Sequence, residues 1–200
     1  GTTSLTGVNT FNIKNSTGPV TITHIPDATM SIGLSGSVLN KIDATYSQSA
    51  TTGNNDKLLI NLDTVSNAEI TVRAPYYTST TTTGSFETAE INVSGQSSLT
   101  NYKLITSTTP SITYLPSLTM SGSGNLTIGT DDALVGVTDL LITDTGAINL
   151  GTILTTPLRN LNASTAGVIT ASSITGASTG LSVTLNPNSS NADNLTLVGT

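Results

Sequence analysis

The chain has no cysteine and no tryptophan, and only 4% of its 200 residues are aromatic. Without cysteine, it forms no disulfide and offers no thiolate for catalysis or metal binding. Charged residues contribute only 9% of the composition. Leu, Ile and Val supply nearly all of the large apolar side chains. Any hydrophobic core must therefore be thin and aliphatic.

Basic residues are scarce as well, and the formal net charge is −6. They are scattered along the chain, at Lys14, Lys41, Lys57, Arg73, Lys103 and Arg159. Because no basic cluster is present to neutralise phosphates, neither nucleic acid nor an anionic membrane surface is an expected partner. No apolar run approaches the roughly 20 residues that span a bilayer, so membrane insertion is not expected either.

Thr and Ser are abundant and together make up about a third of the chain. Disordered chains are usually charged and poor in β-branched residues, whereas Thr, Val and Ile suit pleated, half-buried surfaces. Ordered β structure is therefore predicted. The sequence opens at Gly1 without a Met. We expect it to be a segment of a longer protein whose targeting signals lie outside it.

Alternation of apolar and polar residues, the signature of strands, recurs on both sides of short turns. It is seen in residues 11–22, 58–72, 89–104, 139–150, 161–171 and 174–185. Turn glycines recur at nearly equal intervals at Gly124, Gly146 and Gly167, and Gly180 is interpreted as the next turn. A period near twenty with two short strands per repeat predicts an all-β fold, a parallel β-solenoid resembling a β-helix. Aliphatic residues would stack inward in each coil.

The spacing is less regular toward the N-terminus, and loop insertions at 47–57 and 74–86 are the expected reason. We therefore expect an irregular β region with long loops over residues 1–88. More regular solenoid coils are expected over residues 89–200, and the two regions could form one continuous domain. An ordinary β-sandwich built from hairpins is the alternative fold.

Few residues are candidates for chemistry. His24 is the single histidine, and its position before Pro26 favours a strand residue over a member of a catalytic triad. Asp131 and Asp132 are adjacent, which on a strand would point their side chains to opposite faces rather than across a catalytic cleft. Enzyme activity is therefore not expected. The loop at Asp131 and Asp132 is instead the best candidate for a calcium site, since calcium binds carboxylate and carbonyl oxygens. Asp139 or Asp144 could lie nearby in the next coil, and solvated turn residues are the alternative.

Four segments occur in a characteristic order: "NDKLLINLDTVSNAEITV", "FETAEINVSGQSSLTNYKL", "PSLTMSGSGNLTIGT" and "NADNLTLVGT". This order resembles the repeat region of bacterial surface-layer (S-layer) proteins of the calcium-dependent, type I-secreted (RTX-like) family. The resemblance covers roughly residues 56–200. It implies an extracellular protein of the bacterial cell surface that assembles into a two-dimensional lattice with calcium. No G-G-x-G-x-D nonapeptide is present, so the calcium ligands of that family are not carried over onto any residue of this chain.

Three functions remain open at this point. The first is a structural module of a self-assembling surface layer, which would associate with its own copies and could hold cell-surface polysaccharide through other parts of the chain. The second is a secreted adhesin, or passenger-type solenoid, that presents loops to host glycans or proteins. The third and least favoured is a polysaccharide-active β-helix enzyme.

Overall fold

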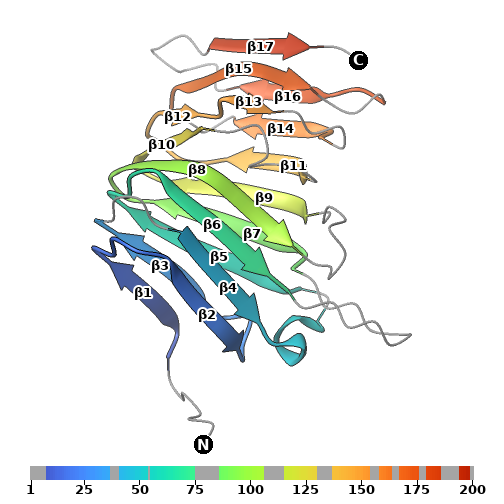
Figure 1. The fold of residues 1–200 in the computed structure, drawn as a ribbon. Coiled ribbons are helices and arrows are strands. Elements are labelled where there is room, and N and C mark those ends of the chain that lie inside the picture. Colours follow the sequence, from blue (N-terminus) through green and yellow to red (C-terminus); the bar gives the residue numbers. More distant parts are fainter. Residues whose placement is uncertain are drawn as a thin grey trace, which may run out of the picture.

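The computed structural model describes residues 8–36, 41–53, 55–74, 86–105, 115–129, 137–153, 158–163, 167–175, 179–185 and 194–198. They form two parallel sheets, of eight and nine strands (Figure 1). The first sheet contains β1 (Thr10–Lys14), β3 (Ser31–Ser35), β5 (Lys57–Asp63), β7 (Thr88–Val93), β9 (Leu115–Gly122), β11 (Val137–Ile142), β14 (Asn160–Ala163) and β16 (Ser182–Leu185). The second contains β2 (Val20–Ile25), β4 (Lys41–Tyr46), β6 (Ala68–Arg73), β8 (Gln96–Ile105), β10 (Asn125–Ile128), β12 (Ile148–Asn149), β13 (Thr152–Ile153), β15 (Ile169–Thr175) and β17 (Asn194–Val198).

The chain alternates between the two sheets, so each coil adds a rung to both of them. In Figure 1 the coils stack from β1 and β2 near the N-terminus to β17 near the C-terminus. Every strand pairing among the described residues is parallel. A sandwich of hairpins would need antiparallel neighbours. The prediction of a parallel β-solenoid is therefore confirmed, and the β-sandwich is excluded.

The core lies between the sheets and consists of aliphatic rows that run along the stack. One row on the first sheet is defined by successive register partners Phe11, Ile32, Ile60, Ile91, Met120 and Ile142. All but Phe11 are fully buried. Strand alternation places every second residue on the inner face, so the period-2 pattern of the sequence becomes these rows.

Coil length differs along the stack. The coils are longer among the register partners Ile32, Ile60, Ile91 and Met120 than among Leu118, Leu140, Leu161 and Val183. Part of the extra length after β4 forms a short 3₁₀ helix, η1 (Gln48–Thr51). Its residues Ala50 and Thr51 are buried against the solenoid. Residues 75–85, within the second expected insertion, lie outside the described residues.

Both sheets continue across residue 88, because β5 pairs with β7 and β6 pairs with β8. The expected division into residues 1–88 and 89–200 stays a prediction. In the described part of the chain, no helix is long and apolar enough to cross a membrane.

The two ends of the stack are less well covered than its middle. Phe11, Ile13, Val20 and Ile22 at the first coil are only half-buried against the core, as are Leu181, Val183 and Leu185 near the last coil. The inward residues of the middle coils have neighbours on both sides and are almost fully buried. Among the described residues, these half-buried positions lie on the first and last strands of the first sheet and on the first strand of the second sheet, or next to them.

Candidate functional site

The predicted calcium residues Asp131 and Asp132 lie outside the described residues. Their two expected neighbours face different ways. Asp139 lies on the outer face of β11, where its carboxylate accepts hydrogen bonds from Thr138 Oγ1 (2.7 Å) and Asn160 Nδ2. Asp144 is fully buried. Within the described ranges, no three His, Cys, Asp or Glu residues are grouped so that they could hold a metal ion. The calcium site at Asp131 and Asp132 therefore stays a prediction.

The single histidine, His24, lies on the exposed edge strand β2. The pairing of β2 with β4 shifts register between Ile22 and Ile25, and His24 has a φ of 60° within this irregularity. Irregularities of this kind are over-represented at the edges of sheets. The position of His24 is thus the one expected from the sequence, a strand residue ahead of Pro26.

One corner of the solenoid is built from stacked glycines. A Cβ atom added to Gly124 would lie 2.2 Å from Gly95 O, one added to Gly146 would lie 1.9 Å from Gly124 O, and one added to Gly167 would lie 2.4 Å from Gly146 O. We call Gly95, Gly124, Gly146 and Gly167 the glycine corner. At Gly124, Gly146 and Gly167 no larger residue fits without moving the backbone of the preceding coil, so successive coils approach as closely here as their backbones allow.

The sequence-based prediction of repeated turns at Gly124, Gly146 and Gly167 therefore corresponds to one physical feature. Gly180 does not belong to it, because a Cβ atom at Gly180 would meet nothing within 4 Å. Gly180 instead precedes β16, where its φ of 111° favours glycine. The short interval from Gly167 to Gly180 is therefore not a shortened coil.

The preceding coils turn at the same corner without a glycine stack. Asn15, Gly36 and Thr64 follow β1, β3 and β5 and have φ values of 49°, 59° and 55°. The Gly36 N–H donates to Asp63 O (2.9 Å), which ties two of these turns together. Thr is an uncommon residue at positive φ. Alternation predicted turns within residues 11–22 and 58–72, but equal glycine spacing gave no indication of the positive φ values at Asn15, Gly36 and Thr64. Asn15 and Gly36 carried a usable signal, since Asn and Gly are enriched in this conformation.

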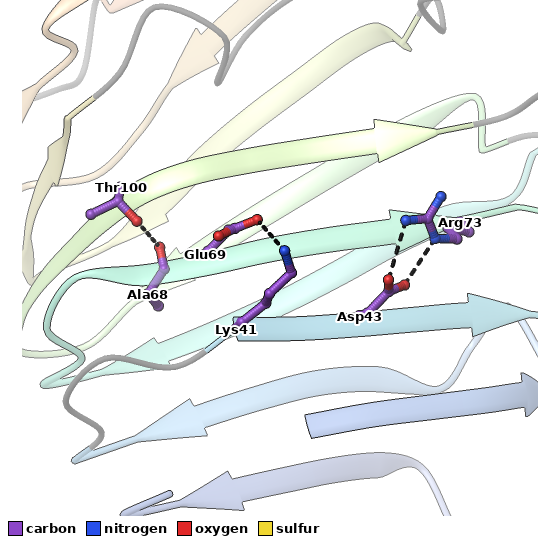
Figure 2. A network of polar contacts seen from close by, with 6 residues as sticks. All are labelled: Lys41, Asp43, Ala68, Glu69, Arg73 and Thr100. Carbon is purple, nitrogen blue, oxygen red and sulfur yellow. Dashed lines mark hydrogen bonds and ion pairs between the residues drawn. The ribbon is translucent and has the colours of Figure 1, made fainter. Parts of the chain in front are cut away.

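The outer face of the second sheet carries cross-strand ion pairs (Figure 2). Lys41 Nζ on β4 lies 3.0 Å from Glu69 Oε1 on β6. Arg73 Nε and Nη2 donate to the two carboxylate oxygens of Asp43 at 2.9 and 3.1 Å, a two-point contact that fixes the guanidinium orientation. The two side chains of each pair point along the surface toward each other. Each pair therefore joins adjacent coils, and its two charges largely neutralise each other.

A second polar cluster crosses three strands of the first sheet. Glu90 on β7 accepts hydrogen bonds from Lys57 on β5 and from Ser121 on β9, and Asn92 Nδ2 donates to Ser121 Oγ (3.1 Å). Burial by itself would raise the pKa of Glu90, but the hydrogen bonds from Lys57 and Ser121 and the charge of Lys57 outweigh it and lower the pKa. The carboxylate is therefore held ionised between two coils.

Described aromatic rings point inward rather than outward. Tyr46 and Phe86 contact each other edge-to-face with ring centroids 4.9 Å apart, and Tyr46 Oη donates to Met30 O (2.6 Å). Tyr102 is buried, and Phe11 is half-buried at the first coil. These rings stabilise the core at the N-terminal coils. The outer faces of the described strands present mainly small polar residues and paired charges.

We compared the chain with protein-family models, with curated proteins and with solved structures, and none of them matches it.

Proposed function

We propose that the chain is a structural module of a self-assembling bacterial surface layer, which acts outside the cell by presenting rigid β faces and open strand edges to neighbouring subunits. The proposal starts from the resemblance of residues 56–200 to the repeat region of calcium-dependent, type I-secreted surface-layer proteins. The expectations of calcium binding, secretion and lattice formation rest on that resemblance.

One structural observation supports this proposal most directly. Among the described residues, β1 and β2 are edge strands at one end of the stack and β16 is an edge strand at the other. An edge strand has unpaired N–H and C=O groups that can bind a strand of another chain. The apolar residues Ile13, Ile22 and Val183 beside these edges are half-buried. They would gain burial when a further coil covers them.

The stiffness of the module has a physical basis as well. Continuous parallel pairing, inward aliphatic rows and the glycine corner leave little freedom for one coil to move against the next. Lattice subunits need such stiffness because small bends accumulate over many repeats. Paired charges and neutral hydroxyl and amide groups on the outer faces suit a hydrated surface in contact with other copies.

The test uses the full-length protein and static light scattering in 1–10 mM calcium. The variant Thr21→Lys with Thr23→Lys places two charges on the exposed face of the edge strand β2, whereas Thr127→Lys places one on the exposed face of the internally paired strand β10. Lys residues on an edge strand oppose pairing with another chain.

We expect calcium-dependent association of the unmodified protein and of Thr127→Lys, and weakened association of the β2 variant. Equal association of both variants would remove the β2 edge as a contact surface. A protein that stays monomeric in calcium at high concentration would contradict the lattice role itself.

A further inference from the structure

A carboxylate occupies a position in the core where four of the five preceding coils carry aliphatic residues and the fifth carries a glycine. One inward row of the first sheet runs through the register partners Ile13, Leu34, Leu62, Val93 and Gly122. The next coil continues beyond β11 with Thr143 N–H donating to Met120 O (2.8 Å) and Thr145 N–H to Gly122 O (3.2 Å). Asp144, between these two residues, is the next member of that row.

Asp144 is wholly inaccessible to solvent, with a relative exposure of 0%. Its Oδ1 accepts the Gly146 N–H at 2.7 Å, and its main-chain oxygen accepts the Gly167 N–H at 2.9 Å. These bonds connect it to two members of the glycine corner. Its other carboxylate oxygen, Oδ2, has no partner among the described residues. A buried carboxylate oxygen without a partner is costly when it is charged.

In the part of the chain that the structure describes, the elements around Asp144 offer no compensating charge. The sequences of β9, β10, β12, β14 and β15 contain no Asp, Glu, Lys, Arg or His. On β11 itself, Asp139 lies on the outer face and is bonded to Thr138 and Asn160. Arg159, just before β14, is exposed. Burial raises the pKa of Asp144, and the hydrogen bond from Gly146 lowers it only in part.

We propose that Asp144 makes the corner between β11 and β12 sensitive to pH: the corner is held firmly while the buried carboxyl carries a proton, and it loosens when the proton leaves. The neutral acid fits an aliphatic row, since it places no net charge between coils. Ionisation would leave a charged oxygen there, and opening of the corner toward water would relieve it. This inference does not depend on the surface-layer role.

The direction in which the stability of the corner changes with pH follows from the thermodynamic linkage between proton binding and folding. The folded-state pKa of Asp144 lies above its unfolded value of 3.8, so below that value the carboxyl is protonated in both states. As pH rises above 3.8, the unfolded or opened state ionises first, and the native corner is progressively destabilised until the folded-state pKa has been passed. Within this window the closing equilibrium constant falls by up to about tenfold per pH unit.

The test measures hydrogen exchange of the amides of residues 137–150 in the full-length protein, corrected for the intrinsic pH dependence of exchange. Asp144→Asn keeps an oxygen that can accept the Gly146 N–H and removes the charge. Asp139→Asn is the matched control, one strand away on the outer face. We expect protection to fall with rising pH in the unmodified protein and in Asp139→Asn, and to stay level in Asp144→Asn.

An identical fall in Asp144→Asn would overturn the inference. If that variant does not fold, a pH titration of the carboxyl-carbon NMR resonance of Asp144 in the unmodified protein tests the inference instead. A titration midpoint above the unfolded value of 3.8 supports the inference, and a midpoint at or below it overturns the inference. A shift of that resonance on adding calcium at fixed pH would likewise overturn it, by assigning a cation to Oδ2 in place of the proton.

Discussion

The coils from β3 to β8 and those from β9 to β16 share one core but hold their surfaces together differently. The earlier coils are longer, and the ion pairs Lys41–Glu69, Lys57–Glu90 and Arg73–Asp43 join neighbouring strands. The later coils are shorter and nearly equal in length. At one turn of each coil, Gly124, Gly146 and Gly167 pack directly against the glycine of the preceding coil. The inward rows continue through both regions.

This difference shows which interactions define the fold and which make only small contributions to its stability. Exposed ion pairs each contribute only about 0–1 kcal/mol, so they cannot be the main reason that the earlier coils stack. Glycine is a steric requirement at Gly124, Gly146 and Gly167, because any side chain there would overlap the backbone of the preceding coil. The aliphatic rows supply most of the favourable free energy in both regions.

The largest expected effect is at the glycine corner. Gly146→Ala would place a methyl group 1.9 Å from Gly124 O, which forces adjacent coils apart. We expect a loss of about 3 kcal/mol or more in the free energy of unfolding, measured by urea denaturation. Gly18→Ala is the control, because its Cβ atom would meet nothing within 4 Å. Equal losses in both variants would show that the corner is not tightly stacked.

Core truncation should affect the two regions alike. Ile60 and Leu140 are buried on β5 and β11, one in each region. Replacing either by Ala should lower the free energy of unfolding by about 2–5 kcal/mol. Leu141, the neighbour of Leu140, is 37% exposed and should cost about 1 kcal/mol or less on replacement by Ala. A large cost at Ile60 with almost none at Leu140 would contradict a continuous core.

The pH response should differ in sign between the regions. Because the folded-state pKa of Glu90 is lowered from 4.5, its contribution to stability is complete above that value and is lost as pH falls through the folded pKa. Glu90→Gln should therefore destabilise by about 1 kcal/mol at pH 7 and by less at pH 3. Chemical denaturation at the two pH values measures this. A cost that grows on acidification would contradict the assigned ion pair.

The smallest expected effect concerns the Asp43–Arg73 pair in Figure 2. A double-mutant cycle with Asp43→Asn and Arg73→Met isolates their interaction, for which we expect about 0.5 kcal/mol at low salt. Because both side chains are partly exposed, 1 M NaCl should reduce this coupling. Coupling that persists unchanged in salt would indicate a contact governed by packing.

Some of these features could be read from the sequence and others could not. Alternation and glycine spacing predicted the parallel coils, because inward rows and sterically restricted turns both recur with the coil. Asp144 also carried a signal, since it follows Leu140 and Ile142 at alternate positions and so belongs to the inner face. The ion pairs could not be predicted, because unequal insertions hide which residues of successive coils become neighbours. The positive φ of Thr64 could not be predicted, because Thr is uncommon in that conformation, whereas Asn67 in the same turn is a residue typical of it.

The proposed surface-layer role makes this solenoid a building unit of an ordered array. Electron microscopy of the full-length protein, with and without calcium, tests it most directly. We expect separate particles without calcium and extended two-dimensional arrays with it. Separate particles in both conditions, at concentrations where surface proteins assemble, would contradict it.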